Sequence, residues 1–112
     1  MKTIIMDIIC TRTSNGIPQI NITPHLHHHS PDGFEFGYGG SGPADLALNI
    51  LDMFIGDNGE SRVTLWDKNT TSQSAWNLHQ DFKNHFIASM NKDGGTIKGQ
   101  DVLNWIKERN HI

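Results

Sequence analysis

The chain is short of cysteine, of basic residues and of long apolar runs. It has one cysteine in 112 residues, Cys10, so no disulfide can form within it. Nine Lys and Arg stand against twelve Asp and Glu, which gives a net charge of −3. Neutralisation of phosphates dominates the affinity of proteins for nucleic acids. A chain with so few basic residues is therefore not expected to bind DNA or RNA.

The N-terminal run Met1–Cys10 is apolar, but Asp7 interrupts it and it is too short to cross a bilayer. It also lacks the long apolar region and the small-residue cleavage site of a signal peptide. We therefore expect a cytoplasmic protein that does not associate with membranes. Cys10 lies inside this run, where a thiol behaves as a small buried hydrophobe.

What the chain does contain indicates one ordered domain, residues 1–112. Its length is common for a single domain, and its apolar residues form distinct clusters. A chain of this size buries roughly two-thirds of its surface on folding, which is enough for one modest core.

The first third of the chain predicts three strands. Lys2–Thr11 is rich in Ile and alternates between two faces. Gln19–His28 alternates apolar and polar residues, although Pro24 confines it to a sheet edge or a bulge. A turn at residues 30–33 leads to a short third strand, Phe34–Tyr38. Together these segments predict an antiparallel β-meander.

Three later segments have helical patterns. In the first, which begins at Pro43 and ends at Gly56, apolar residues recur at a spacing of four, and Asp45 meets the positive end of the helix dipole. The second is Ala75–Met90 and the last is Gly99–Arg109. The expected fold class is therefore α+β, with a short antiparallel β-meander packed against about three α-helices.

A glycine-rich turn, Gly37–Gly42, lies between the third predicted strand and the first predicted helix. Glycines let the backbone approach a ligand closely, and the free N–H groups at the start of a helix favour an anion. The Ser41 hydroxyl adds a donor, and the Tyr38 ring could stack on a base. This pattern predicts a phosphate-bearing ligand held by Tyr38, Gly39, Gly40, Ser41 and Gly42.

Two other interpretations of this turn stay open. It matches the G-x-G-x-x-G pattern of dinucleotide-binding folds, with Asp67 as the possible acidic partner. However, Glu35 interrupts the preceding strand, and the hairpin signals before it do not fit a parallel sheet. Alternatively, the glycines serve only a tight reversal of the chain, and Asp45 satisfies the free N–H groups.

Residues 30–48, SPDGFEFGYGGSGPADLAL, resemble the signature of a family of small uncharacterised bacterial and phage proteins. Residues 78–83, LHQDFK, and the closing segment Ile97–Ile106 with its Trp-Ile pair are similar to that family as well. The resemblance spans roughly Thr23 to Lys107.

The chain departs from this family in two places. It has extra residues between Asp57 and Ser74, which could form a fourth short strand or a surface excursion, and Lys98 stands where a hydroxyl cap is usual before the last helix. The family comes without an assigned reaction. Its association with phages implies accessory or anti-defence roles in the host cytoplasm. The chain also looks similar in style to some phage proteins of this size, which sequester the cyclic nucleotide signals of host immunity as oligomers.

Histidines and a lysine offer further chemistry. His25, His27 and His29 would share one face of a strand, a spacing that suits a metal ion with an open position for water. No carboxylate or general base lies at a motif distance from them, so we assign no metal site. His29 and Lys83 are instead candidate countercharges for a phosphate at the turn. No arrangement of residues suggests a nucleophile, so we expect no catalytic residue and no cofactor.

The leading hypothesis is a non-enzymatic binder of a phosphate-containing small molecule, with a cyclic nucleotide as the suspected ligand and anti-defence sequestration as the role. The alternatives are a protein-interaction module that inhibits a host protein by strand addition at Gln19–His28, and a small metal-dependent hydrolase. Three Trp and five Phe leave aromatic surface to cover, so we also expect a homo-oligomer.

Overall fold

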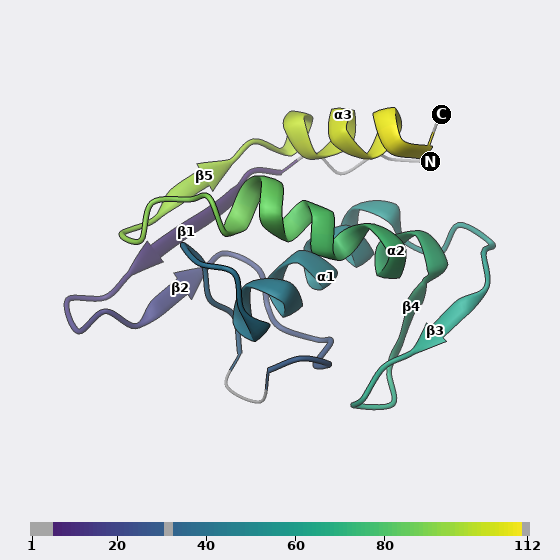
Figure 1. Ribbon diagram of the computed structural model, residues 1–112, viewed down its shortest axis with the longest axis horizontal. Helices are drawn as coiled ribbons and strands as arrows, with labels where there is room; N and C mark the ends of the chain where they lie inside the picture. Colours follow the sequence, from purple (N-terminus) through teal and green to yellow (C-terminus); the bar gives the residue numbers. More distant parts are fainter. Residues whose placement is uncertain (1–5, 31–32, 111–112) are drawn as a thin grey trace.

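The computed structural model describes residues 6–30 and 33–110. It contains helices and two small antiparallel sheets, and this confirms the α+β class (Figure 1). The elements in chain order are β1 (Ile8–Arg12), β2 (Pro18–Ile20), α1 (Ser41–Ile55), β3 (Arg62–Thr64), β4 (Thr70–Ser72), α2 (Gln73–Phe82), the π-helical turn η1 (Lys83–Ile87), β5 (Gly95–Ile97) and α3 (Gly99–Asn110).

The first sheet has the order β2-β1-β5, with β1 antiparallel to both neighbours. Cys10 lies opposite Ile20 on one side and opposite Gly95 on the other. Ile8 and Cys10 are buried while Ile9, on the other face, is exposed, as the alternation in the sequence predicts. β3 and β4 form a separate hairpin at the opposite end of the molecule from the β1–β2 hairpin (Figure 1).

The predicted third strand, Phe34–Tyr38, is wrong, because this segment pairs with no strand in the described part of the chain and β5 occupies the place beside β1. Its backbone groups have other partners. The Arg12 guanidinium donates to the carbonyl of Phe36, the Phe36 N–H donates to the carboxylate of Glu35, and the Gly37 N–H donates to the carbonyl of Ile87. Groups satisfied in this way do not need a neighbouring strand.

The predicted second strand, Gln19–His28, is also shorter than expected, because β2 ends at Ile20. Beyond Pro24, which has no N–H to give, the N–H groups of His25 and Leu26 donate to the side chain of Asn49 on α1. A helix side chain therefore takes the place of a strand neighbour. Residues 2–5 of the first predicted strand and residues 31–32 of the predicted turn lie outside the described residues.

The predicted helices are present, with changes at their ends. α1 begins at Ser41 and ends before Gly56, and α3 begins at Gly99. The second helix changes register after Phe82, where the Ala88 N–H donates to the carbonyl of Lys83 and forms a π-type turn.

The last helix is capped by a residue distant in sequence. Lys98 offers no hydroxyl, and the Gly99 N–H donates instead to the carboxylate of Asp7, at 2.9 Å. The end of the chain is thereby attached to the segment that leads into β1.

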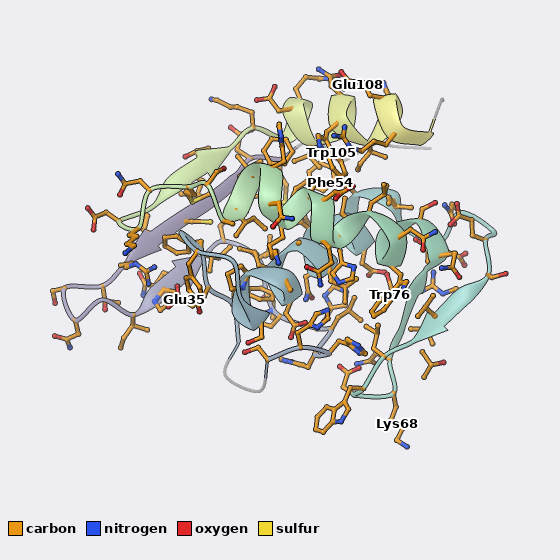
Figure 2. The ribbon with its side chains drawn as sticks, in the orientation of Figure 1. Glu35, Phe54, Lys68, Trp76, Trp105 and Glu108 are labelled. Carbon is orange, nitrogen blue, oxygen red and sulfur yellow. The ribbon has the colours of Figure 1, made fainter. Side chains whose placement is uncertain are left out.

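One core cluster joins the first sheet to all the helices. Trp105 of α3 lies edge-on to Phe82 of α2, with ring centres 5.3 Å apart (Figure 2). A smaller cluster of Leu26, Leu48 and Leu65 lies between α1 and the β3–β4 hairpin. In the part of the chain that the structure describes, no helix has the length and apolar character that a membrane span requires.

Candidate functional site

A polar stripe on α1 holds an irregular segment that we call the histidine loop, residues 25–30. Asp45, Asn49 and Asp52 are spaced so that they lie on one side of the helix. The Asp45 carboxylate is 1% exposed and accepts the N–H groups of residues 28, 29 and 30 at 2.8 to 3.3 Å. The side chain of Asn49 both accepts from the loop and donates to it. Its oxygen accepts the N–H groups of His25 and Leu26, and its NH₂ group donates to the carbonyl of Leu26.

This use of Asp45 leaves the glycine-rich turn without the acidic cap that the sequence allowed. Gly40 is the N-cap of α1, and no side chain of the described residues makes a capping hydrogen bond at the start of this helix. The N–H groups of Gly39, Gly40, Ser41 and Gly42 have no hydrogen-bond acceptor among the described residues. Gly39 and Ser41 are exposed while Gly42 is buried, so the positive end of this helix of 15 residues is open to an anion at residues 39–41.

The glycines of the turn differ in what they do. Gly37 has a positive φ of 83°, and a Cβ atom there would lie 2.9 Å from the Cα atom of Lys92. A Cβ atom at Gly42 would lie 2.8 Å from the Cβ atom of Glu35. Gly37 and Gly42 are therefore needed for close packing of the backbone.

Gly39 and Gly40 are under weaker constraint. A Cβ atom at Gly39 would be 4.0 Å from the methyl group of Ala88, an ordinary contact, and Gly39 is exposed. At Gly40 the obstacle is the ring of Tyr38, which lies against the glycine and can move. Close packing therefore does not require a glycine at position 39, which is the most open glycine of the turn.

A groove of about 850 Å³ runs beside the turn. Tyr38 and Ser41 line it from the turn, and Glu35, whose charge is paired with Arg12 at 2.9 Å, lines it as well. The rest of the wall comes from β2, from its flanks and from the segment before the turn: Ile17, Pro18, Gln19, Ile20, Ile22, Pro24, Ser30, Gly33 and Phe34. The groove thus reaches the start of α1 at Ser41, and its wall is about half polar and half apolar.

His29 does not lie in this groove. Its Nε2 atom is 2.9 Å from Nε2 of His79, and burial lowers the pKa of both imidazoles more than the nearby charge of Asp45 raises it. His29 is therefore neutral at neutral pH, and the countercharge role predicted for it has no support in the structure.

Lys83, the other predicted countercharge, begins η1 and is half-buried. Its charge acts on His29, and it makes no hydrogen bond or ion pair with the turn among the described residues. Lys92, which sequence reasoning missed, is the cation whose backbone and side-chain stem pack against Gly37. No local signal links Lys92 to a turn so far away along the chain.

The three histidines predicted to share a strand face diverge instead. His25 bonds the carboxylate of Asp52 at 2.9 Å, the backbone of His27 pairs with Asp67, and His29 contacts His79. No group of three or more His, Cys, Asp and Glu side chains that could hold a metal ion occurs in the described part of the chain. The three-histidine geometry that suggested a metal-dependent hydrolase is therefore not found among the described residues.

A second hollow, of about 620 Å³, lies beside the histidine loop. It is lined by His27, His28, His29, Ser30, Trp66 and Asp67. Trp76 of α2, which Figure 2 labels, packs against the rings of residues 28, 29 and 79. Sequence reasoning did not identify this hollow. The visible signal was Trp66, an aromatic residue in a polar, turn-rich segment.

These features define an α+β protein with an open helix N-terminus and two neighbouring hollows. The chain belongs to a family that is described as a family of unknown function (DUF6166), which matches residues 3–108. This agrees with the resemblance to an uncharacterised family and says nothing of phages or of cyclic nucleotides. No curated protein and no solved structure matches the chain.

Proposed function

We propose that this protein is a non-enzymatic binder of a phosphate-containing small molecule, with a cyclic nucleotide as the first ligand to test. The observation that carries the proposal is the N-terminus of α1, where successive N–H groups have no acceptor in the described residues and where Ser41 lines a groove of about 850 Å³. Binding of this kind requires no acid–base pair.

The chemistry of the groove fits a nucleotide better than a free anion. A phosphate would accept from the N–H groups of the turn and from the Ser41 hydroxyl, while the half-exposed Tyr38 ring offers a surface for a base. Glu35 would repel an anion, but its charge is offset by Arg12. Lys92 adds an exposed cation near the turn. In a phage-encoded protein such a binder would sequester signals of host immunity, a role that rests on the sequence resemblance alone.

Isothermal titration against cyclic mono-, di- and trinucleotides tests the proposal. Ser41→Ala removes one donor to the phosphate and is expected to weaken binding about tenfold, in line with hydrogen bonds to charged groups. Gly39→Ala leaves the fold intact but places a methyl group where the ligand must approach, and we expect a similar or larger loss.

Ser61→Ala is the matched control, because Ser61 is exposed and is not among the residues that line the groove. It should bind like the wild type. Absence of heat with every nucleotide at micromolar protein would remove the proposal, and so would unchanged affinity in both turn variants.

A protein-interaction module is the second candidate. β2 is an edge strand, and the groove runs along it, so an extended segment of another protein could pair there. A pull-down from host lysate separates the two functions, since a stoichiometric protein partner in place of nucleotide binding favours this candidate.

We also propose that the protein forms a homo-oligomer. Ile9 and Ile17 are 46% and 58% exposed, and both belong to the region of the β1–β2 hairpin. Symmetric self-association would cover such surface. Sedimentation equilibrium measures the number of subunits, and a monomer at all concentrations would contradict this expectation.

A further inference from the structure

Trp66 is the most exposed large apolar side chain among the described residues, at 77%. It lies in the turn between β3 and β4, near Lys68, whose side chain extends from the tip of this hairpin (Figure 2). Leaving an indole in water forfeits the free energy that its burial would contribute. The fold has therefore not used Trp66 for packing.

The turn that carries Trp66 is nonetheless fixed in place by the histidine loop. The Trp66 N–H donates to Nδ1 of His28 at 2.9 Å. Asp67 and His27 form two bonds, because the Asp67 carboxylate accepts the His27 N–H at 2.8 Å and the Asp67 N–H donates to the His27 carbonyl at 3.2 Å. The side-chain amide of Asn69 donates to the carbonyl of His25 at 3.1 Å. The indole is thus exposed on a turn whose backbone is already ordered, which lowers the entropic cost of stacking a ligand on it.

The polar groups of the adjoining hollow suit an uncharged ring. Since Nδ1 of His28 accepts a hydrogen bond, the proton of the neutral ring sits on Nε2, and this N–H has no acceptor among the described residues. Burial alone would raise the pKa of Asp67, but hydrogen bonds from Asn69 and from the His27 N–H lower it, so the carboxylate stays ionised at neutral pH. A carboxylate at the rim disfavours a phosphate and favours a heterocycle that carries its own donors.

The two hollows meet at Ser30, which lines both. The two hollows are therefore neighbours, which suits a single ligand that reaches both. We propose that the hollow beside Trp66 is a second subsite, which takes one nucleobase of a dinucleotide whose phosphate is bound at the glycine-rich turn. This inference rests on the proposed function and narrows the ligand to a molecule with two bases.

Titration of a cyclic dinucleotide and of a cyclic mononucleotide with the same base tests the inference. The dinucleotide should bind at least tenfold more tightly than the mononucleotide. Trp66→Ala should weaken the dinucleotide by about 5- to 150-fold, the range of base–aromatic stacking, and leave the mononucleotide unchanged. Trp66→Phe keeps a ring and should lose less than threefold. The dinucleotide should also quench the fluorescence of Trp66.

Both variants are expected to fold, because the Trp66 side chain forms no hydrogen bond with the described residues and only its backbone does, and equal urea midpoints confirm this. If neither nucleotide binds, the proposed function fails and this inference fails with it. If both bind with equal affinity and Trp66→Ala changes neither, the inference alone is overturned and the binding function stands.

Discussion

His79 is 2% exposed and lies in an aromatic cluster with His28, His29 and Trp76. Its Nδ1 atom is 2.6 Å from the carbonyl oxygen of Trp76, which can only accept, so Nδ1 carries the proton. The unprotonated Nε2 atom then accepts from the Nε2–H group of His29. This arrangement requires a neutral His79, since a second proton would set two N–H groups against each other.

We predict that the protein loses stability as the pH falls below about 6.5. Burial lowers the pKa of His29 and His79 in the folded state, so the unfolded chain binds protons first as the pH falls. The free energy of unfolding changes little through this pair between pH 8 and 7, where both states are mostly unprotonated. From about pH 6.5 down to the lowered pKa values it decreases by up to about 1.4 kcal/mol per pH unit for each group. Urea titrations at pH 8, 7, 6 and 5 measure this slope.

The matched variants for this prediction are His79→Gln and His85→Gln. His79→Gln should show a shallower slope than the wild type between pH 6.5 and 5. His85 is exposed, and its replacement should leave the slope unchanged. Equal slopes in all three proteins would show that the pair does not govern the acid response.

At the scale of elements, the attachment of the histidine loop to α1 positions both hollows. Among the described residues the loop has no sheet partner, and apart from the His27 N–H, which Asp67 accepts, its N–H groups depend on the side chains of Asp45 and Asn49. Ser30, at the end of the loop, lines both hollows. A buried carboxylate that accepts three N–H groups contributes more than neutral hydrogen bonds do.

We predict that Asp45→Asn lowers the free energy of unfolding by about 3 kcal/mol. An amide of the same shape keeps one acceptor but turns an NH₂ group toward a buried N–H, which leaves donors without partners. Urea denaturation measures the loss. Asp81→Asn, an exposed position on α2, is the control and should change stability by less than about 0.5 kcal/mol. A loss of similar size in both variants would contradict the role of Asp45.

At the scale of the whole molecule, the first sheet joins segments from the two ends of the chain. β1 lies between β2, its neighbour in sequence, and β5, which comes from near the other end of the chain. Cys10 is in the middle of β1, 1% exposed, and burial raises the pKa of its thiol to about 11. A thiol in this position becomes reactive only when the sheet and the helices over it separate.

We predict that labelling of Cys10 by a disulfide reagent at pH 8 reports global unfolding. The free energy obtained from the labelling rate should equal that from urea denaturation, because the same core cluster must open in both cases. Ile9→Cys in a Cys10→Ala background is the control, since position 9 is on the exposed face of the same strand and should react quickly. Rapid labelling of native Cys10 would show that the sheet opens locally.

Local patterns in the sequence determined much of the fold. The apolar spacing that starts at Pro43 and the terminating Gly56 marked α1 to within two residues, and the alternation from Ile8 to Cys10 gave the buried face of β1. These features depend on interactions between neighbours in sequence, so the sequence shows them directly. The turn Gly37–Gly42 was visible for the same reason.

Only the tertiary structure decided which partner each polar and backbone group takes. β5 displaced the predicted strand Phe34–Tyr38 because the Phe36 backbone is satisfied by Arg12 and Glu35. Asp45 was expected to act on the start of its own helix. It binds the histidine loop instead, and that choice leaves the N–H groups of the turn without an acceptor among the described residues. Such pairings depend on distances between segments far apart in the chain, which no local pattern encodes.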